Sequence, residues 1–354
     1  MTQNIEQFLA DKAAWKKAIA PYQQSDLRRS LWQLVNTLIP YTLLWGLMIL
    51  VIRAAYSLWL LLPLVILAAG FMVRSFIIFH DCGHGAFFAD RRANEIVGFI
   101  TGVLTLTPYF SWRHGHALHH ASSGDLDRRG PGDIWMMTVD EYRAASPWQR
   151  FGYRMYRTPV ILLLVGPALL FLLFQRFPNK YDRAKERHSV FLTDFTILLP
   201  AVLISLLIGF KAYIILQVAV MGLAATAGVW LFYVQHQYEG VYWKRHEKWD
   251  YAVAAVTGSS YYKLPRLLQW FTGNIGYHHI HHLSPRIPNY NLEACHEATP
   301  SLQVKPLTLG QSWRSLRFRL WDEANHRLIS FREFRALPVA TADKAITLPK
   351  NTPV

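Results

Sequence analysis

Four long apolar runs divide this chain. Residues about 34–52, 57–79, 192–210 and 212–234 each approach the roughly 20 apolar residues that a helix needs to cross a bilayer. Only a short turn separates the two runs of each pair. In the first pair this turn ends at Tyr56, and in the second pair it is expected at Lys211. The pattern therefore predicts an all-α, multi-pass membrane protein with four transmembrane helices arranged as two hairpins.

Two shorter apolar runs, 96–110 and 160–174, are too short for confident spans and predict interfacial or re-entrant helices. The polar stretch 111–158 predicts a long loop. Residues 1–33 are polar, with Ile5, Phe8, Leu9 and Ile19 at spacings that fit either an amphipathic helix on the membrane surface or an ordinary polar tail.

The distribution of positive charge predicts the orientation. Four spans place residues 1–33, 80–191 and 235–354 on one side, and these stretches hold nearly all the Lys and Arg, so that side is expected to be cytoplasmic. We expect Arg74, close to the end of the second span, to extend to the headgroups on the same side. The predicted organisation is an N-terminal cytoplasmic or interfacial segment (1–33), a membrane domain (34–300) and a C-terminal cytoplasmic tail (301–354).

Composition agrees with a membrane protein. Hydrophobic types make up 52% of the chain and charged types only 17%, below the quarter that is usual in soluble domains. The net charge of +14 is diffuse and lacks the basic, aromatic-interleaved runs of nucleic-acid binders, so no nucleic-acid partner is expected. Two cysteines, Cys82 and Cys295, exclude a disulfide framework and a cysteine zinc cage.

Three clusters of histidine carry the candidate chemistry. They read "HDCGH", "HALHH" and "HHIHH", and the last two share the spacing HxxHH. Offsets of three and four residues place side chains on one helical face, so each cluster can present two or three imidazoles to a common point. The candidate metal ligands of these clusters are His80, His84, His116, His119, His120, His278, His281 and His282.

His236, just past the last span in "FYVQHQYEG", is a ninth candidate ligand. A zinc site is saturated by three or four ligands, so eight or nine converging imidazoles exceed one metal and fit two. The expected fold therefore includes a cytoplasmic helical cap that holds a di-metal histidine site. The lone Glu-x-x-His, Glu293 and His296, is interpreted as coincidental, because a carboxylate di-iron site needs a second such pair. Residues that could orient the ligand imidazoles are Asp81, His114, Asp133, Glu239 and His279.

The histidine clusters and their flanks resemble the integral-membrane fatty acid desaturases. The matching segments are "HDCGHGAFF", "WRHGHALHHASSGDLDRRGPGDIW", "GNIGYHHIHHLSPRIPNYNL" and, around His236, "FYVQHQYEGVYW". The resemblance covers roughly residues 30–300 and is strongest to the bacterial acyl-lipid branch, which includes delta-5 and delta-12 (omega-6) types.

This resemblance implies a di-iron enzyme (Fe²⁺/Fe³⁺) that uses dioxygen to introduce a cis double bond into the acyl chain of a membrane lipid. It also implies the bacterial inner membrane as location. The chain has no dinucleotide-binding G-x-G-x-x-G motif, so two electrons are expected from ferredoxin or a cytochrome-type donor with its reductase.

Two alternatives remain at this point. A membrane di-iron hydroxylase or alkane monooxygenase would share the same metal site and differ only after the first hydrogen abstraction. A His-rich metal transporter is the remote alternative, because transport favours polar ligands within the spans, near the middle of the membrane.

Overall fold

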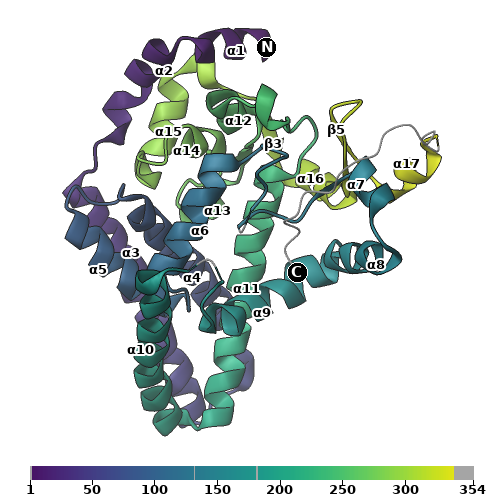
Figure 1. Cartoon of the computed structure of the whole chain (residues 1–354). Coiled ribbons are helices and arrows are strands. Elements are labelled where there is room, and N and C mark those ends of the chain that lie inside the picture. Colours follow the sequence, from purple (N-terminus) through teal and green to yellow (C-terminus); the bar gives the residue numbers. More distant parts are fainter. Residues whose placement is uncertain (1, 131, 181, 339–354) are drawn as a thin grey trace.

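The computed structural model describes residues 2–130, 132–180 and 182–338. Within these residues four helices are long and apolar enough to cross a membrane, and they form the elongated lower part of Figure 1. The helices are α3 (Leu27–Arg53), α4 (Leu61–His84, preceded by the short η2, Leu58–Leu60), α10 (Ala184–Ile208) and α11 (Phe210–His236). The predicted mainly helical fold with four spans is confirmed.

The spanning helices continue beyond their apolar runs, and this extension places the histidines. Asp26 begins α3 by accepting a hydrogen bond from the amide of Arg29. Gly85 ends α4 in the left-handed conformation, with φ of 67°. In the second hairpin the chain reverses at Gly209 (φ of 85°), so Lys211 lies in the first turn of α11 and not in the connection.

The N-terminal segment packs on protein, not on lipid. It forms α1 (Thr2–Ala10), α2 (Lys12–Ile19) and η1 (Ala20–Gln23), at the top of Figure 1 beside α15. Ile5, Leu9 and Ile19 are buried in the main hydrophobic core. The interpretation of this segment as a membrane-surface helix is therefore wrong, because its apolar face is already covered.

The middle of the chain is more helical than its sequence suggests. The run 96–110 is interrupted at Thr105 and divided between two helices, and the stretch 111–158 is not one long loop. The elements are α5 (Arg91–Leu104), α6 (Tyr109–Ser122), β1 (Met137–Thr138), α7 (Val139–Ala144), α8 (Pro147–Tyr156), the π-helical η3 (Ile161–Val165), α9 (Gly166–Leu172) and η4 (Phe174–Arg176). Helix α8 and residues 161–176 meet at a bend of 65° and together resemble a broken span or re-entrant segment, as predicted for 160–174.

After α11 the chain builds a cap over the helix ends that carry the histidines. Its elements are η5 (His246–Lys248), α12 (Tyr251–Thr257), β2 (Tyr261–Lys263), α13 (Arg266–Phe271), α14 (His278–Leu283), α15 (Asn289–Ala298), η6 (Pro300–Leu302), β3 (Pro306–Thr308), α16 (Leu309–Ser312), η7 (Trp313–Arg317), β4 (Leu320–Asp322), β5 (Arg327–Ile329) and α17 (Phe331–Ala336).

Short strands tie distant parts of the cap together. One small sheet has the order β1-β4-β5, with β4 parallel to β1 and antiparallel to β5, and β2 pairs in parallel with β3. The segment that begins at residue 301, expected as a tail, is therefore folded onto the cap as far as Pro338. Residues 339–354 lie outside the described residues.

Arg74 is buried inside the fold and does not reach the headgroups, so that prediction is wrong. Its Nε donates to Oγ1 of Thr37 at 3.1 Å, and its Nη1 donates to the carbonyl of Trp270. The guanidinium also lies 3.9 Å from the centre of the Trp270 ring. Arg74 thereby fastens α13 of the cap to α3 and α4.

Candidate metal centre

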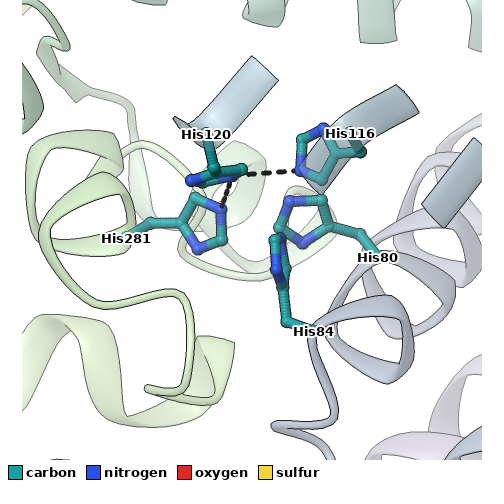
Figure 2. A group of neighbouring side chains, drawn as sticks. All are labelled: His80, His84, His116, His120 and His281. Atoms are coloured by element: carbon teal, nitrogen blue, oxygen red, sulfur yellow. Dashed lines mark hydrogen bonds between the residues drawn. The ribbon is translucent and has the colours of Figure 1, made fainter. Parts of the chain in front are cut away.

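Five histidines from three helices form one group. His80 and His84 lie on α4, His116 and His120 on α6, and His281 on α14. One ring nitrogen of each lies within 4.8 Å of the others, and Figure 2 shows the five rings turned toward a common centre. All five are buried or partly buried.

A second group adjoins the first. It consists of His119 on α6, His236 at the end of α11 and His282 on α14, again with ring nitrogens within 4.8 Å of one another. His278 borders this group, because its Nε2 lies 3.0 Å from Nε2 of His236. The stacked rings of His120 and His282, 4.2 Å apart between centroids, join the two groups. All nine histidines proposed from the sequence thus lie in one cluster.

Helical geometry explains how the HxxHH clusters divide. Residues four apart lie on one helical face, so His116 and His120 both point into the first group. Consecutive residues are about 100° apart around a helix, so His119 points into the second group instead. The same divergence separates His281 from His282 on α14. Each HxxHH segment therefore supplies both groups, and not one common point as its spacing suggested.

The nitrogen separations fit neighbouring ligands of one ion. Nε2 of His120 lies 3.1 Å from Nε2 of both His116 and His281. Two nitrogens that are each about 2.1 Å from a metal are about 3.0 Å apart if the bonds meet at right angles, and about 3.4 Å apart at a tetrahedral angle. The observed values lie between these two, within the range expected for ligands of one ion.

Unpaired buried nitrogens point to the same conclusion. Nε2 of His84, His119 and His282 is buried and has no hydrogen-bond partner among the described residues. A buried polar atom left unpaired costs on the order of 1–3 kcal/mol, so such atoms need an explanation. A bound metal ion would supply the missing partner.

The electrostatic setting favours the neutral form of five of the rings. Burial, and after it the neighbouring imidazoles, holds the pKa of His116, His120 and His281 well below its usual range. Burial likewise depresses the pKa of His278 and His282. The neutral imidazole is the form that binds a metal, so these five rings are in the form needed for ligation at physiological pH.

Acceptors behind three of the rings set their orientation. Oδ1 of Asp133 lies 2.6 Å from Nδ1 of His119, and Oδ1 of Asp81 lies 3.2 Å from Nδ1 of His80. The carbonyl of Gly258 lies 3.3 Å from Nδ1 of His236. An acceptor at Nδ1 keeps the proton there and leaves Nε2 free to face the centre. The structure thus brings Asp81 and Asp133 to the positions that the sequence suggested.

The other proposed supporting residues do not contact the nine histidines in this way. His279 is buried but turned away, with its Nε2 3.1 Å from Nδ1 of His296. His114 is partly exposed and Glu239 is exposed, and in the described part of the chain neither hydrogen-bonds to a histidine of the cluster.

Asn289, on α15, was missed as a supporting group. Asn289 donates to Oδ2 of Asp81 from its backbone amide at 2.6 Å and from its side chain at 2.8 Å. His296 belongs to neither histidine group but packs against His279, with ring centroids 5.1 Å apart. The sequence offers no local signal for Asn289.

Aromatic side chains border the cluster on two sides. Trp112 stacks on His116 at 4.3 Å between centroids, and Phe232 lies 5.1 Å from His119 and 5.0 Å from His236. A cavity of about 10 Å³ adjoins the second group and holds about one water-sized molecule. Its lining consists of His119, Ser123, Asp133, Ile134, Phe232, His236, Gln237 and Trp243.

Comparison with known proteins agrees with this centre. The family model for fatty acid desaturases matches residues 57–313. A fatty acid desaturase of Bacillus subtilis (strain 168) is 48% identical over 95% of this chain and 94% of its own length. An sn-1 acyl-lipid omega-3 desaturase (ferredoxin) of Nostoc sp. (strain 36) is 28% identical over 77% of this chain and 75% of its own length. A chloroplastic omega-6 fatty acid desaturase of Arabidopsis thaliana is 28% identical over 74% of this chain and 59% of its own length. The chain therefore belongs to the fatty acid desaturase family and is an enzyme of that class.

Proposed function

We propose that this desaturase is a di-iron, dioxygen-dependent enzyme that introduces a cis double bond into the acyl chain of a membrane lipid. The convergence of eight imidazoles in two adjoining groups, with His278 beside the second group, supports it most directly. So many nitrogens exceed the four positions of a zinc site, whereas iron accepts imidazole and can keep open positions for dioxygen. The proposed ligands are His80, His84, His116, His119, His120, His236, His278, His281 and His282.

When bound, two irons would supply the dioxygen activation needed to remove hydrogen from two adjacent methylene groups. The overall change consumes one dioxygen, two electrons and two protons, and it yields one double bond and two waters. Other residues of the chain orient the imidazoles and place apolar side chains beside them. Asp133 and Asp81 fix two rings through Nδ1, while Trp112 and Phe232 give the cluster apolar borders.

The position of the cluster supports an acyl substrate. His80 and His84 end the second spanning helix and His236 ends the fourth, so the histidines follow directly on lipid-length apolar segments. An acyl chain in the adjoining leaflet has only a short path to this level. A transporter would instead need its ligands near the middle of the spans, and the two histidine groups lie at their ends.

We further propose an external electron donor, ferredoxin or a cytochrome-type protein with its reductase, on the cytoplasmic side of a bacterial inner membrane. The Nostoc relative carries ferredoxin in its name. The N-terminal ends of the spanning helices α3 and α10 are also rich in positive charge, with Arg28, Arg29, Arg183 and Arg187, which favours the cytoplasmic side.

Expression in a bacterial host without desaturases tests the function. We expect membrane lipids to gain acyl chains that are lighter by two hydrogens, with the double bond located by mass spectrometry of separated lipid classes. Acyl chains that gain an oxygen would instead identify a hydroxylase. Metal analysis of the purified protein is expected to give about two irons per chain. One zinc per chain without iron would contradict the di-iron assignment.

A further inference from the structure

We propose that α8 lies in the plane of the membrane surface, with one aromatic face inserted in a phospholipid leaflet. Trp148, Phe151 and Met155 are 81%, 57% and 43% exposed. Their spacing of three and four residues places them on one face of the helix. A row of large, exposed apolar side chains on one helix face indicates that this face is covered by an apolar partner.

The opposite face of α8 is fixed to the cap. Tyr153 is fully buried in a small core with Met137, Tyr142 and Leu320. Its hydroxyl accepts a hydrogen bond from the amide of Met137 at 3.2 Å and donates to the carbonyl of Arg319. Tyr153 lies about 140–200° around the helix from the three exposed residues, because each residue turns the helix by about 100°. The Tyr153 face of α8 thus packs against protein, whereas the opposite face is exposed.

Two arginines lie between these faces. Arg154 is exposed and Arg150 is partly exposed. Both guanidiniums donate to neutral oxygens: that of Arg154 to the hydroxyl of Tyr142, and that of Arg150 to the carbonyl of Ala145. Neither forms an ion pair with a carboxylate among the described residues, and α8 itself contains no acidic residue. A helix with an aromatic face, a basic border and no acidic group matches an anionic lipid surface.

The chain that follows α8 argues for lipid rather than for a second protein copy. Beyond the 65° bend, Leu164 and Leu169 are exposed on residues 161–176, an apolar segment. This segment packs along α11, and the hydroxyl of Thr226 donates to the carbonyl of Leu163 at 2.7 Å. Figure 1 shows α8 extending sideways from α9, away from the long helices. The exposed face of α8 is therefore continuous with a surface that meets the hydrocarbon.

The same helix is connected to the second histidine group. Arg157 follows α8 directly, is fully buried, and donates to Oε1 of Gln237 at 3.0 Å and to the carbonyl of Phe318 at 2.9 Å. Gln237 is the neighbour of His236 in sequence. Lipid contact at Trp148 would therefore help to set the height of the histidine groups above the hydrocarbon. This consequence rests on the proposed function, whereas the membrane contact itself does not.

Site-directed spin labelling of the full chain tests the contact. Cys82 and Cys295 are buried, so Trp148→Cys, Phe151→Cys and Met155→Cys can each be labelled selectively, with unmutated protein as the labelling blank. Glu297→Cys, at an exposed position of α15, is the matched control in water. The protein is reconstituted in vesicles of phosphatidylcholine and phosphatidylglycerol, and the accessibility of each label to dioxygen and to a water-soluble nickel complex is measured.

We expect the three α8 labels to favour dioxygen over the nickel complex and the label at position 297 to show the reverse. Preferential access of the nickel complex at positions 148, 151 and 155 would overturn the proposal. So would labels shielded from both reagents and coupled to labels of another copy, because a protein partner would then cover this face. The measurement needs no turnover, so its failure is distinct from a failure of the proposed desaturase chemistry.

Discussion

The rings of His119 and His120, consecutive residues of α6, are inclined by 79° and face different histidine groups. His119 lies 4.8 Å from His236 between ring centroids, whereas His120 lies 4.6 Å from His116. One turn of one helix thus contributes to both halves of the proposed centre. A change at either position should affect a different half.

Removing either imidazole should abolish desaturation. We expect His119→Ala and His120→Ala each to lower product formation by more than about 100-fold, above the range usual for supporting residues, because a ligand itself is lost. Membrane insertion should be unchanged, since α6 is not one of the four candidate spans. His188→Ala is the matched control, because His188 is exposed and belongs to neither group. Near-normal activity in either variant would remove that residue from the ligand set.

Local periodicity explains what the sequence could predict. The length of an apolar run indicates a span, and the i, i+4 spacing of His80 and His84 indicates a shared helical face. Both features depend only on neighbouring residues. The division of the HxxHH clusters could not be predicted, because it depends on how α6, α11 and α14 pack. Asp81 and Asn289 are 208 positions apart, so their hydrogen bond has no local signature.

The wrong predictions share a physical cause. An apolar face on a helix indicates burial, but it does not say whether protein or lipid covers it. Ile5 and Leu9 on α1 are buried against the cap, whereas Trp148 on α8 is exposed. A charge near the end of a span is equally ambiguous. Arg74 had an internal partner in Trp270, which lies 196 positions away.

The carboxylate of Asp133 should strengthen metal binding through His119. Asp133→Asn keeps the size of the side chain but weakens the acceptor at Nδ1 of His119, 2.6 Å away. We expect iron affinity and activity to fall by about 10–100-fold, the usual effect of losing such a partner. Iron retained during dialysis against a chelator measures the loss. Asp140→Asn, an exposed change on α7, serves as control, and equal retention in both variants would argue against this role.

Asn289 should act on the same centre through Asp81. Asn289→Ala removes the side-chain donor to Asp81 and leaves a buried carboxylate oxygen with one partner fewer. We expect the free energy of unfolding to fall by about 1–3 kcal/mol and iron to be lost faster. Gln33→Leu is the comparison, because Gln33 donates to Oδ1 of Asn289 at 3.1 Å and does not bond to Asp81. Iron loss from Asn289→Ala at the rate seen for Gln33→Leu would show that Asn289 supports only the fold.

The metal-free protein should become less stable as the pH falls below about 6.5, the usual pKa of histidine. Burial holds the pKa of His278, His281 and His282 well below that value in the folded state. Between the folded and unfolded pKa values the unfolded chain therefore binds more protons, and the free energy of unfolding falls with falling pH by up to about 1.4 kcal/mol per pH unit for each such ring. Above about pH 7.5 both states are neutral at these rings, so they add no slope there.

The thermal midpoint of chelator-treated protein in one detergent, measured from about pH 8 to about pH 5.5, checks this expectation. We expect a plateau at the upper end and a steady fall below about 6.5, with the same profile for His188→Ala, since that side chain is exposed. Iron-loaded protein should hold its midpoint to lower pH, because the metal stabilises the folded state in which its ligands are neutral. A midpoint of the metal-free protein that stays constant or rises on acidification would contradict the assignment of these imidazoles as buried and neutral.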